Sequence, residues 1–249
     1  PSISASSGYS SIYINGGQVD NKGIEASLTL NQPLGPVQWN STFTYTINRN
    51  KIKKLLKPTT LSNGEVVKQD MMDLGGLEIV NSRLFEGGSI GDLYVTALRT
   101  DSHGYIDVDY VNNTVAIDNK AGERQDGWIY AGNSQAKYMM GWRNSFSWKG
   151  LTLGCLVNAR IGGIVVSQTQ AMMDAYGVST ATAEARDLGY VLIDGYKVPA
   201  VQKYYSTVGS GVGSMYVYSA TNVRLAELSL GYNIPVQKWV PWIQGMNVA

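Results

Sequence analysis

The chain has 249 residues and a formal net charge of +1, and charged residues make up 16% of it, against about 25% in a typical soluble domain. This length allows one large or two ordinary domains, and the near-neutral charge, with no basic stripe beyond a lysine-rich stretch at 51–57, argues against a nucleic-acid binder. The single cysteine, Cys155, excludes an internal disulfide and a thiolate metal site, and the single histidine, His103, leaves no partner for a two-histidine zinc site.

Five strands are predicted along the chain, at 24–31, 37–50, 138–148, 151–166 and 221–232. The clearest is in WNSTFTYTINRN, residues 39–50, because apolar and polar side chains alternate there with the strand period of two. One face of this strand carries Trp39, Phe43, Tyr45 and Ile47, and the other carries Asn40, Thr42, Thr44, Thr46 and Asn48.

The connections between these strands differ sharply in length. QPLGP at 32–36 and Lys149-Gly150 are tight turns, whereas 51–137 and 167–220 are long. An up-and-down count puts all short turns at one end and all long loops at the other, the asymmetry expected of a membrane barrel. This count requires an even number of barrel strands within 51–137. Either 91–99 and 104–110 form a pair of strands, or the whole segment is an extracellular excursion. The loop 167–220 contains two helical-looking pieces, AMMDAYG and ATAEARDLG.

Alternation alone leaves open which face of the strands is covered, because a sandwich turns its apolar face inward and a membrane barrel turns it to lipid. The predicted strands at 37–50 and 151–166 are longer than the usual five or six residues of soluble strands. Low charge with 16 tyrosines and 28 glycines fits an outer-membrane barrel but also many soluble β-proteins. Aromatic residues near the strand ends suit a membrane-interface girdle, although they also favour strands in general.

The sequence has no run of 18 apolar residues, and therefore no predicted transmembrane helix. It opens at Pro1 without a methionine, has no basic-then-apolar start, and stops within an extended pattern at Ala249. We interpret it as an internal or processed piece and expect any signal peptide to lie outside it.

No catalytic constellation is found. The GSGVG stretch at 209–213 lacks the spacing and the Lys-Ser/Thr ending of a phosphate loop. Asp107 and Asp109 share a face of a possible strand, but nothing around them indicates a glycosidase cleft. Ser145 and Ser147 have no histidine to activate them. We predict that the protein is not an enzyme and has no cofactor and no metal.

Five stretches resemble motifs of the SusC/RagA-type TonB-dependent transporters of Bacteroidota, in that family's order and spanning residues 21–235. The stretches are NKGIEASLTL, WNSTFTYTINRNKIKKL, GGSIGDLY, GWRNSFSWKGLTLGCLVNARIGG and ATNVRLAELSLGYNIP. In AGNSQAKY, Ala136 stands where the family usually has proline, which puts only the local turn in doubt.

This resemblance implies an all-β fold, an antiparallel transmembrane β-barrel, of which residues 1–249 would be the carboxy-terminal part of a 22-stranded wall. The implied extracellular loops are at about 51–137 and 167–220, and the plug domain is not present. We expect roughly six to eight strands in a curved antiparallel sheet. Phe43, Tyr45 and Ile47 would face lipid, and Thr42, Thr44 and Thr46 would face a polar lumen.

The function implied by the resemblance is TonB-dependent active import of oligosaccharides or oligopeptides across the cell outer membrane. The implied partners are a SusD-like surface lipoprotein that acts as a lid, the lipid bilayer, the substrate, and TonB, which would act through a plug and an amino-terminal segment absent here. The alternative is a soluble or surface-exposed β-sandwich carbohydrate-binding module, which would purify without detergent.

Substrate or lid contacts are expected at Tyr94, Arg99, Tyr190, Tyr204 and Tyr205. The loop 167–220 is rich in tyrosine, whose flat ring and hydroxyl suit sugars, peptides and protein interfaces. Tyr204 and Tyr205 are singled out because two adjacent rings in a loop are hard to bury together. The alternative is that these rings pack the loop against itself.

Overall fold

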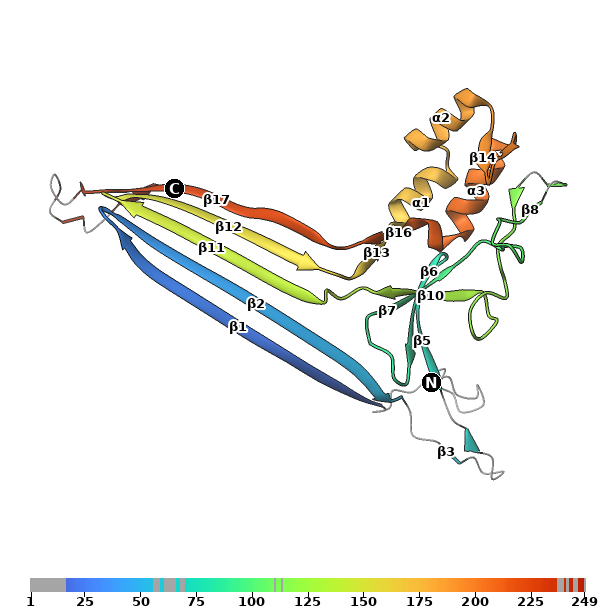
Figure 1. Cartoon of the computed structure of the whole chain (residues 1–249), viewed down its shortest axis with the longest axis horizontal. Coiled ribbons are helices and arrows are strands. Elements are labelled where there is room, and N and C mark those ends of the chain that lie inside the picture. Colours follow the sequence, from blue (N-terminus) through green and yellow to red (C-terminus); the bar gives the residue numbers. More distant parts are fainter. Residues whose placement is uncertain are drawn as a thin grey trace. The chain divides into compact units, whose positions relative to one another are not determined.

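The computed structural model describes residues 17–55, 59–60, 66–67, 70–109, 111–112, 114–236, 240, 242–243 and 246–248. The chain divides into two compact units, which are described separately (Figure 1). The α/β unit comprises Pro1–Asn21, Asn50–Asn133 and Val166–Tyr218, and the sheet unit comprises Lys22–Arg49, Ser134–Val165 and Ser219–Ala249.

The sheet unit is built on six strands in the order β1-β2-β11-β12-β17-β18. Their bounds are β1 Gln18–Leu34, β2 Val37–Lys54, β11 Tyr138–Trp148, β12 Leu151–Ile161, β17 Asn222–Ile234 and β18 Met246–Val248. The pairs from β2 to β18 are antiparallel, and the strands lie side by side in Figure 1. All five predicted strands are present, and the sheet has six, within the predicted six to eight.

The two short connections are tight hairpin turns, as predicted. Lys149 and Gly150 join β11 to β12, and both have positive φ, 46° and 87°. This backbone matches the right-handed twist of the flanking strands. Gly35 joins β1 to β2 with φ 62°. The predicted strand 151–166 ends earlier, at Ile161, because Gly162 and Gly163 take φ of 80° and 85° and break the ladder.

The α/β unit contains a four-stranded sheet in the order β10-β7-β6-β5 and three helices. The bounds in this sheet are β5 Met71–Leu77, β6 Val80–Phe85, β7 Asp92–Thr96 and β10 Trp128–Asn133. The helices are α1 Gln168–Ala175, α2 Thr180–Leu188 and α3 Val201–Gly211, followed by the 3-10 turn η2 Gly213–Tyr216. Short two-stranded pieces are β3 Thr59–Thr60 with β4 Val66–Val67, β8 Val108–Asp109 with β9 Thr114–Val115, and β14 Val191–Ile193 with β15 Tyr196–Val198. A further pair is β13 Ile164–Val166 with β16 Val217–Ser219.

Local sequence explains the first two helices. The Ser167 hydroxyl accepts a hydrogen bond from the Gln170 amide and caps α1, and Ser179 does the same for α2 through Thr182. Gly189 ends α2 in the left-handed region at φ 79°. Both helical pieces predicted in 167–220 are therefore confirmed, whereas α3 was not predicted. Within the described residues, no helix combines the length and the apolar character needed to cross a membrane.

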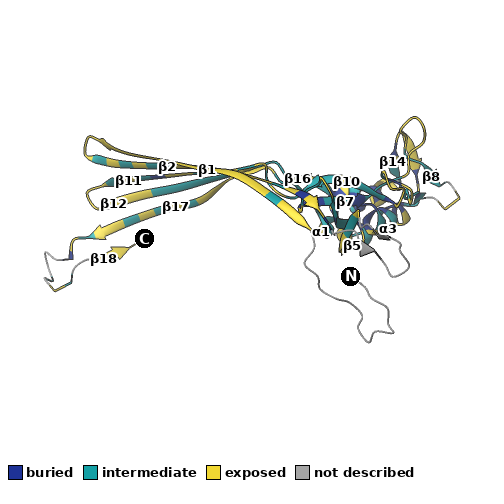
Figure 2. Ribbon diagram, turned by 90° about the horizontal axis from the view of Figure 1, so that it is seen from below, coloured by how far each residue is buried: buried dark blue, intermediate teal, exposed yellow. Residues whose placement is uncertain are grey.

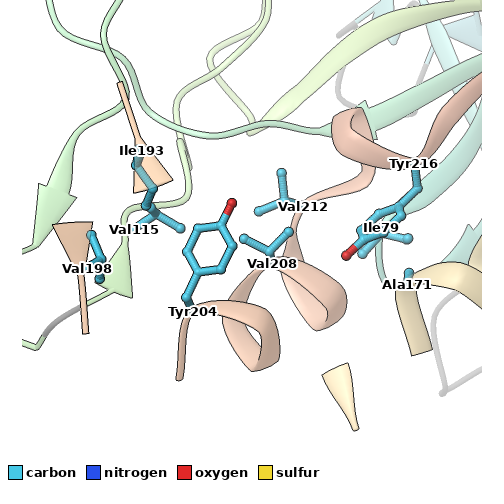
Figure 3. Packing of buried hydrophobic residues seen from close by; sticks show 9 residues of the cluster. All are labelled: Ile79, Val115, Ala171, Ile193, Val198, Tyr204, Val208, Val212 and Tyr216. Atoms are coloured by element: carbon cyan, nitrogen blue, oxygen red, sulfur yellow. The ribbon is translucent and has the colours of Figure 1, made fainter. Parts of the chain in front are cut away.

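The two long connections share one hydrophobic core. Its fully buried members from the first connection are Ile79 and Val115, and those from the second are Ala171, Ile193, Val198, Tyr204, Val208, Val212 and Tyr216 (Figure 3). Of the two alternatives for 51–137, a pair of barrel strands at 91–99 and 104–110 is wrong, since β7 pairs with β6 and β10 in a sheet of its own. The prediction of a strand-rich fold with antiparallel sheets is confirmed, and this unit adds three helices to it.

Helices α1 and α3 cross at Gly209. A Cβ added there would fall against the Ala171 carbonyl and the Ala175 amide, so the helices could not approach this closely. Gly209→Ala should therefore destabilise the α/β unit by about 1–3 kcal/mol, although alanine favours a helix more than glycine does. Hydrogen exchange of the α1 and α3 amides measures this, with Ser210→Ala at the exposed neighbouring position as the control. Unchanged or slower exchange in Gly209→Ala would contradict the packing described.

Candidate functional site

The register of the six-stranded sheet separates apolar from polar side chains row by row. Directly opposite residues of antiparallel strands share a face. One row is Phe43, Trp142, Val157 and Leu225, and the adjacent row is Thr44, Gly141, Asn158 and Arg224. The predicted two-faced character of strand 39–50 therefore extends across the sheet.

The apolar face of the sheet is exposed. Phe43 is 42% exposed, Leu225 60% and Leu228 69%, although they lie among other large apolar side chains. Other exposed apolar residues of this face are Ile24, Leu28, Leu30, Leu34, Trp142, Phe146, Trp148, Leu151, Leu153, Val223, Leu230 and Tyr232. Of the buried apolar residues that the structure describes, only Val236 belongs to the sheet unit, and Figure 2 shows its strands mostly exposed or intermediate.

Two polar residues of the apolar face, Asn144 and Ser41, accept hydrogen bonds from tryptophan side chains. The Trp39 indole N–H donates to Asn144 Oδ1 at 3.1 Å, and Asn144 is only 5% exposed. The Trp142 indole N–H donates to the Ser41 hydroxyl at 2.9 Å. Because their hydrogen-bonding groups are satisfied within the sheet, these residues remain compatible with apolar surroundings.

The polar face carries hydroxyls, amides and charges. Arg143 and Glu227 form an ion pair at 2.8 Å, and the Thr29 and Thr42 hydroxyls are 3.1 Å apart. A pocket on the sheet is lined by Thr44, Thr46, Met139, Met140, Gly141, Asn158, Ala159, Arg160, Asn222 and Arg224. This is the polar concavity that a bound solute would meet on this unit.

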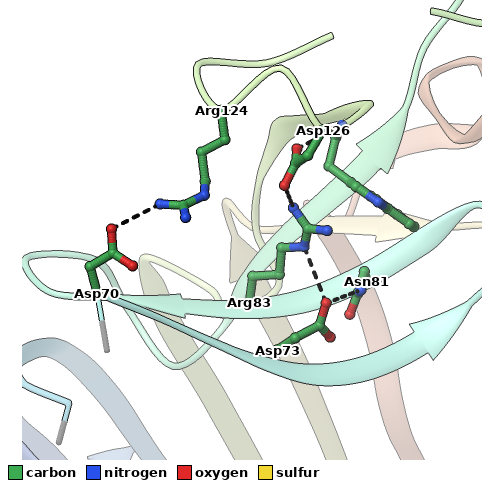
Figure 4. Close-up of polar contacts among 7 residues, drawn as sticks. Asp70, Asp73, Asn81, Arg83, Arg124 and Asp126 are labelled. Carbon is green, nitrogen blue, oxygen red and sulfur yellow. Dashed lines mark hydrogen bonds and ion pairs between the residues drawn. The ribbon is translucent and has the colours of Figure 1, made fainter. Parts of the chain in front are cut away.

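In the α/β unit, a nearly buried arginine joins the strands of the four-stranded sheet. Arg83 lies 2.7 Å from an Asp126 oxygen and 3.5 Å from an Asp73 oxygen (Figure 4). The central carbon of its guanidinium lies 5.0 Å from the centroid of the Trp128 ring. Asn81 also donates to Asp73, at 2.9 Å. Two carboxylates and a ring around one cation are a stabilising network and not a vacant site.

The glycine-rich segment 87–91 is held from both sides. The Asn50 side-chain oxygen accepts from the Ser89 hydroxyl at 2.5 Å and from the Ile90 amide at 2.8 Å. Asp92 accepts from the Ser89 amide at 2.7 Å and from Asn133 at 2.9 Å. This segment, which carries one of the family-like motifs, is therefore a fixed turn.

Tyr94 and Arg99, two of the predicted contact residues, have partners within the α/β unit. The Tyr94 ring lies against Phe85 and Tyr130, and burial raises the pKa of its hydroxyl. Arg99 is exposed and pairs with Asp107 at 2.7 Å. The Asp107 carboxylate therefore offsets part of the charge that Arg99 presents at the surface.

The three predicted contact tyrosines of the second connection differ in exposure. Tyr190 is half-buried beneath the Lys197 ammonium, which lies 4.3 Å from its ring centroid. Tyr204 is 6% exposed and belongs to the core, and burial raises its pKa to about 12. Tyr205 is half-buried, with its ring edge-on to Tyr204 at 5.1 Å and its hydroxyl donating to the Ala181 carbonyl. As expected, the two adjacent rings are not both buried, but the prediction that they lie in a loop is wrong because both are on helix α3.

Exposed apolar side chains other than the five singled-out contacts lie on α1, α2 and the β14–β15 hairpin or beside them. Tyr176 is 78% exposed and Tyr196 62%. The other members of this group, which we name the helical surface, are Met172, Met173, Val178, Leu188 and Leu192. The AMMDAYG stretch, read as a capped helix, was the sequence signal that could have identified Met172 and Met173 as exposed. Within the described ranges, no three His, Cys, Asp or Glu side chains are grouped so that they could hold a metal ion.

Comparison with known proteins finds similarity to a sequence relative and to solved structures, including two of RagAB. The sequence is 25% identical over 246 residues to the TonB-dependent receptor P3 of Formosa agariphila, covering 92% of this chain and 23% of that protein. The fold is similar to the RagAB peptide transporter, with a TM-score of 0.63 and 17% identity, over 99% of this chain and 26% of that one. A second RagAB structure, the peptide importer in the open-open state, is similar with a TM-score of 0.59 and 18% identity. This similarity covers 99% of this chain and 27% of that one. No family model matches the sequence.

These similarities confirm the resemblance to SusC/RagA-type TonB-dependent transporters that the five sequence motifs indicated. The chain spans about a quarter of the length of the proteins it matches.

Proposed function

We propose that the chain forms part of the wall, and an adjoining extracellular domain, of a TonB-dependent importer in the cell outer membrane. One observation carries this proposal: the sheet has an exposed apolar face and a polar face, on strands β1, β2, β11, β12 and β17 that are each at least 11 residues long. Strands of about 9–11 residues cross a bilayer at a tilt. The apolar face suits lipid and the polar face suits a water-filled lumen.

The alternative, a β-sandwich carbohydrate-binding module, would need a second sheet over the apolar face. None of the described apolar side chains of that face is buried, and the relative and the similar structures are a receptor and transporters. The same comparisons favour transport over catalysis.

In this proposal the sheet guides a solute past its polar face while the rest of the barrel closes the path. Oligosaccharides or oligopeptides are the substrates, a SusD-like lipoprotein is the lid, and TonB supplies energy through segments outside this sequence. The structures similar to this fold are titled a peptide transporter and a peptide importer, which supports solute import. The residues of this chain bind and orient a solute, and they change no covalent bond.

The α/β unit is the proposed contact surface for the lid or the substrate. Tyr94, Arg99, Tyr190 and Tyr205 remain the proposed contacts, with Tyr204 supporting Tyr205 from the core. The helical surface adds the exposed rings Tyr176 and Tyr196. Aromatic side chains at the centre of such a surface bury a large apolar area with little loss of side-chain entropy.

The test is uptake and lid capture by the intact transporter in cells. Substituting Tyr176 and Tyr196 with serine should lower co-purification of the lid or uptake of labelled oligosaccharides and peptides, because both rings are exposed and their removal leaves the core intact. Wild-type uptake should also disappear when TonB is removed.

The matched control is Tyr105→Ser, which removes another exposed ring, 58% exposed, from a hairpin of the first connection. Equal barrel assembly in all variants is required. Unchanged uptake and lid capture in the double variant would show that this surface is not a contact. TonB-independent entry would contradict the proposed function as a whole.

A further inference from the structure

The pocket on the polar face of the sheet is lined by polar side chains around a glycine, which has no side chain to fill it. Thr44, Asn158 and Arg224 lie in one cross-strand row, with Gly141 between Thr44 and Asn158. A Cβ on Gly141 would stand 2.8 Å from the Thr44 hydroxyl and 3.3 Å from the Asn158 side-chain oxygen. The missing side chain therefore leaves a hollow that the surrounding polar groups face.

Two arginines in this pocket have no acidic partner among the residues that the structure describes. Arg160 is opposite Asn222, and Arg224 is opposite Asn158, so the arginines are diagonal neighbours on one face. Among the described residues, neither takes part in an ion pair. The Arg160 guanidinium donates to the Ser134 carbonyl at 2.7 Å, which fixes its position without neutralising it.

The Glu227 carboxylate, on the same strand as Arg224, already has a partner. Glu227 is paired with Arg143 at 2.8 Å and also accepts from the Ser229 hydroxyl at 3.2 Å. The polar face therefore has one neutralised pair and, beside it, two arginines that form no ion pair with any described residue. Guanidinium groups with side-chain amides around a hollow match the oxygens of an anion.

We propose that this pocket is a subsite for an anionic group, a carboxylate or a sulfate, of the transported solute, an inference that rests on the proposed function. Arginines lining a pore favour anions over neutral solutes. The anion fits between Arg160 and Arg224, and the side-chain amides of Asn158 and Asn222 supply further donors around it, whereas the Thr44 hydroxyl already donates to the Gly141 carbonyl at 3.3 Å. Acidic sugars and acidic peptides carry the same chemistry, and the experiment distinguishes them.

The test compares acidic probes with their neutral counterparts, using the intact transporter for both binding and uptake. One pair is an oligogalacturonate and its methyl ester, and the other is a tetraglutamate peptide and its glutamine counterpart, all with an uncharged dye. The acidic member of one pair should bind and enter better. Arg160→Gln and Arg224→Gln should each weaken its binding about tenfold and leave the neutral member unchanged.

The control is the double variant Arg143→Gln with Glu227→Gln, which removes a charge pair from the same face without changing the net charge. It should leave the preference intact. Equal binding of acidic and neutral probes, or equal losses for both in Arg224→Gln, would overturn the subsite. If the transporter imports acidic and neutral probes equally, the subsite is contradicted but the proposed function is not. Arginine-dependent binding of an acidic probe that never enters the cell retains the subsite and contradicts the proposed function.

Discussion

Arginine in place of Phe43 should destabilise the transporter in a membrane by about 2–4 kcal/mol, whereas arginine in place of Thr44 should be tolerated. The two positions are neighbours on β2 and have similar backbone surroundings, but the register puts them on opposite faces of the sheet. A guanidinium on the apolar face would have to enter hydrocarbon, while one on the polar face stays in water. The measurement is the free energy of unfolding of the intact protein in lipid vesicles by urea titration.

Phe43→Leu is the matched control for loss of the ring, and it should cost much less than Phe43→Arg because it keeps the face apolar. Equal costs for Phe43→Arg and Thr44→Arg would mean that the sheet does not separate lipid from water.

A second large effect is expected in the α/β unit, where Tyr204→Ala should cost about 3–5 kcal/mol. Tyr204 is 6% exposed and lies between Val115 and Val208 in the core that joins the two long connections (Figure 3). Removing the ring leaves a cavity at the point where residues from both connections meet. The measurement is hydrogen exchange of the α3 and β9 amides in the intact protein.

Tyr204→Phe keeps the ring and should restore most of the stability. It should also reduce the loss of stability at alkaline pH. Burial holds the folded-state pKa near 12 against an ordinary value of 10.0, so the unfolded chain loses this proton first and stability falls from about pH 10 upward. Tyr205→Ala, at a half-buried position, should cost less than Tyr204→Ala. Similar exchange in Tyr204→Ala and wild type would show that this ring is not part of the core.

The sheet could be predicted because its signals are local. Alternation in residues 39–50, the Lys149-Gly150 turn and the proline-rich turn at 32–36 each specify a strand or a reversal within a few residues. The register then follows from keeping apolar side chains on one face. One feature of the sheet was missed. Ala226 is an extra residue in β17, so Leu225 and Leu228 share a face although their spacing is odd.

The α/β unit could not be predicted because its core joins residues far apart in the sequence. Ile79 and Val115 pack with Val208 and Tyr216, and no local pattern indicates these contacts. Helix α3 was missed because VQKYYSTVGSG is rich in β-branched residues and glycine, which are weak helix formers. Packing of Tyr204 and Val208 against the core stabilises it instead.

The predicted contact residues depended on the same missing information. Tyrosine content singled out the segment 167–220, but only packing shows that Tyr204 is buried while Tyr176 and Tyr196 are exposed. The arginines of the pocket were also not predicted. Whether an arginine has an acidic partner depends on which strands are neighbours in the sheet. The Arg143–Glu227 pair, which forms across β12, illustrates this.

The central claim, that one face of the sheet contacts lipid and the other does not, is tested most directly by fluorescence quenching with brominated lipids. A bimane label is placed on a cysteine at Leu228 or at Ser229, in the intact protein with Cys155→Ser, because these neighbours lie on opposite faces of β17. The account predicts strong quenching at 228 and little at 229. Equal quenching at both positions, or stronger quenching at 229, would contradict it.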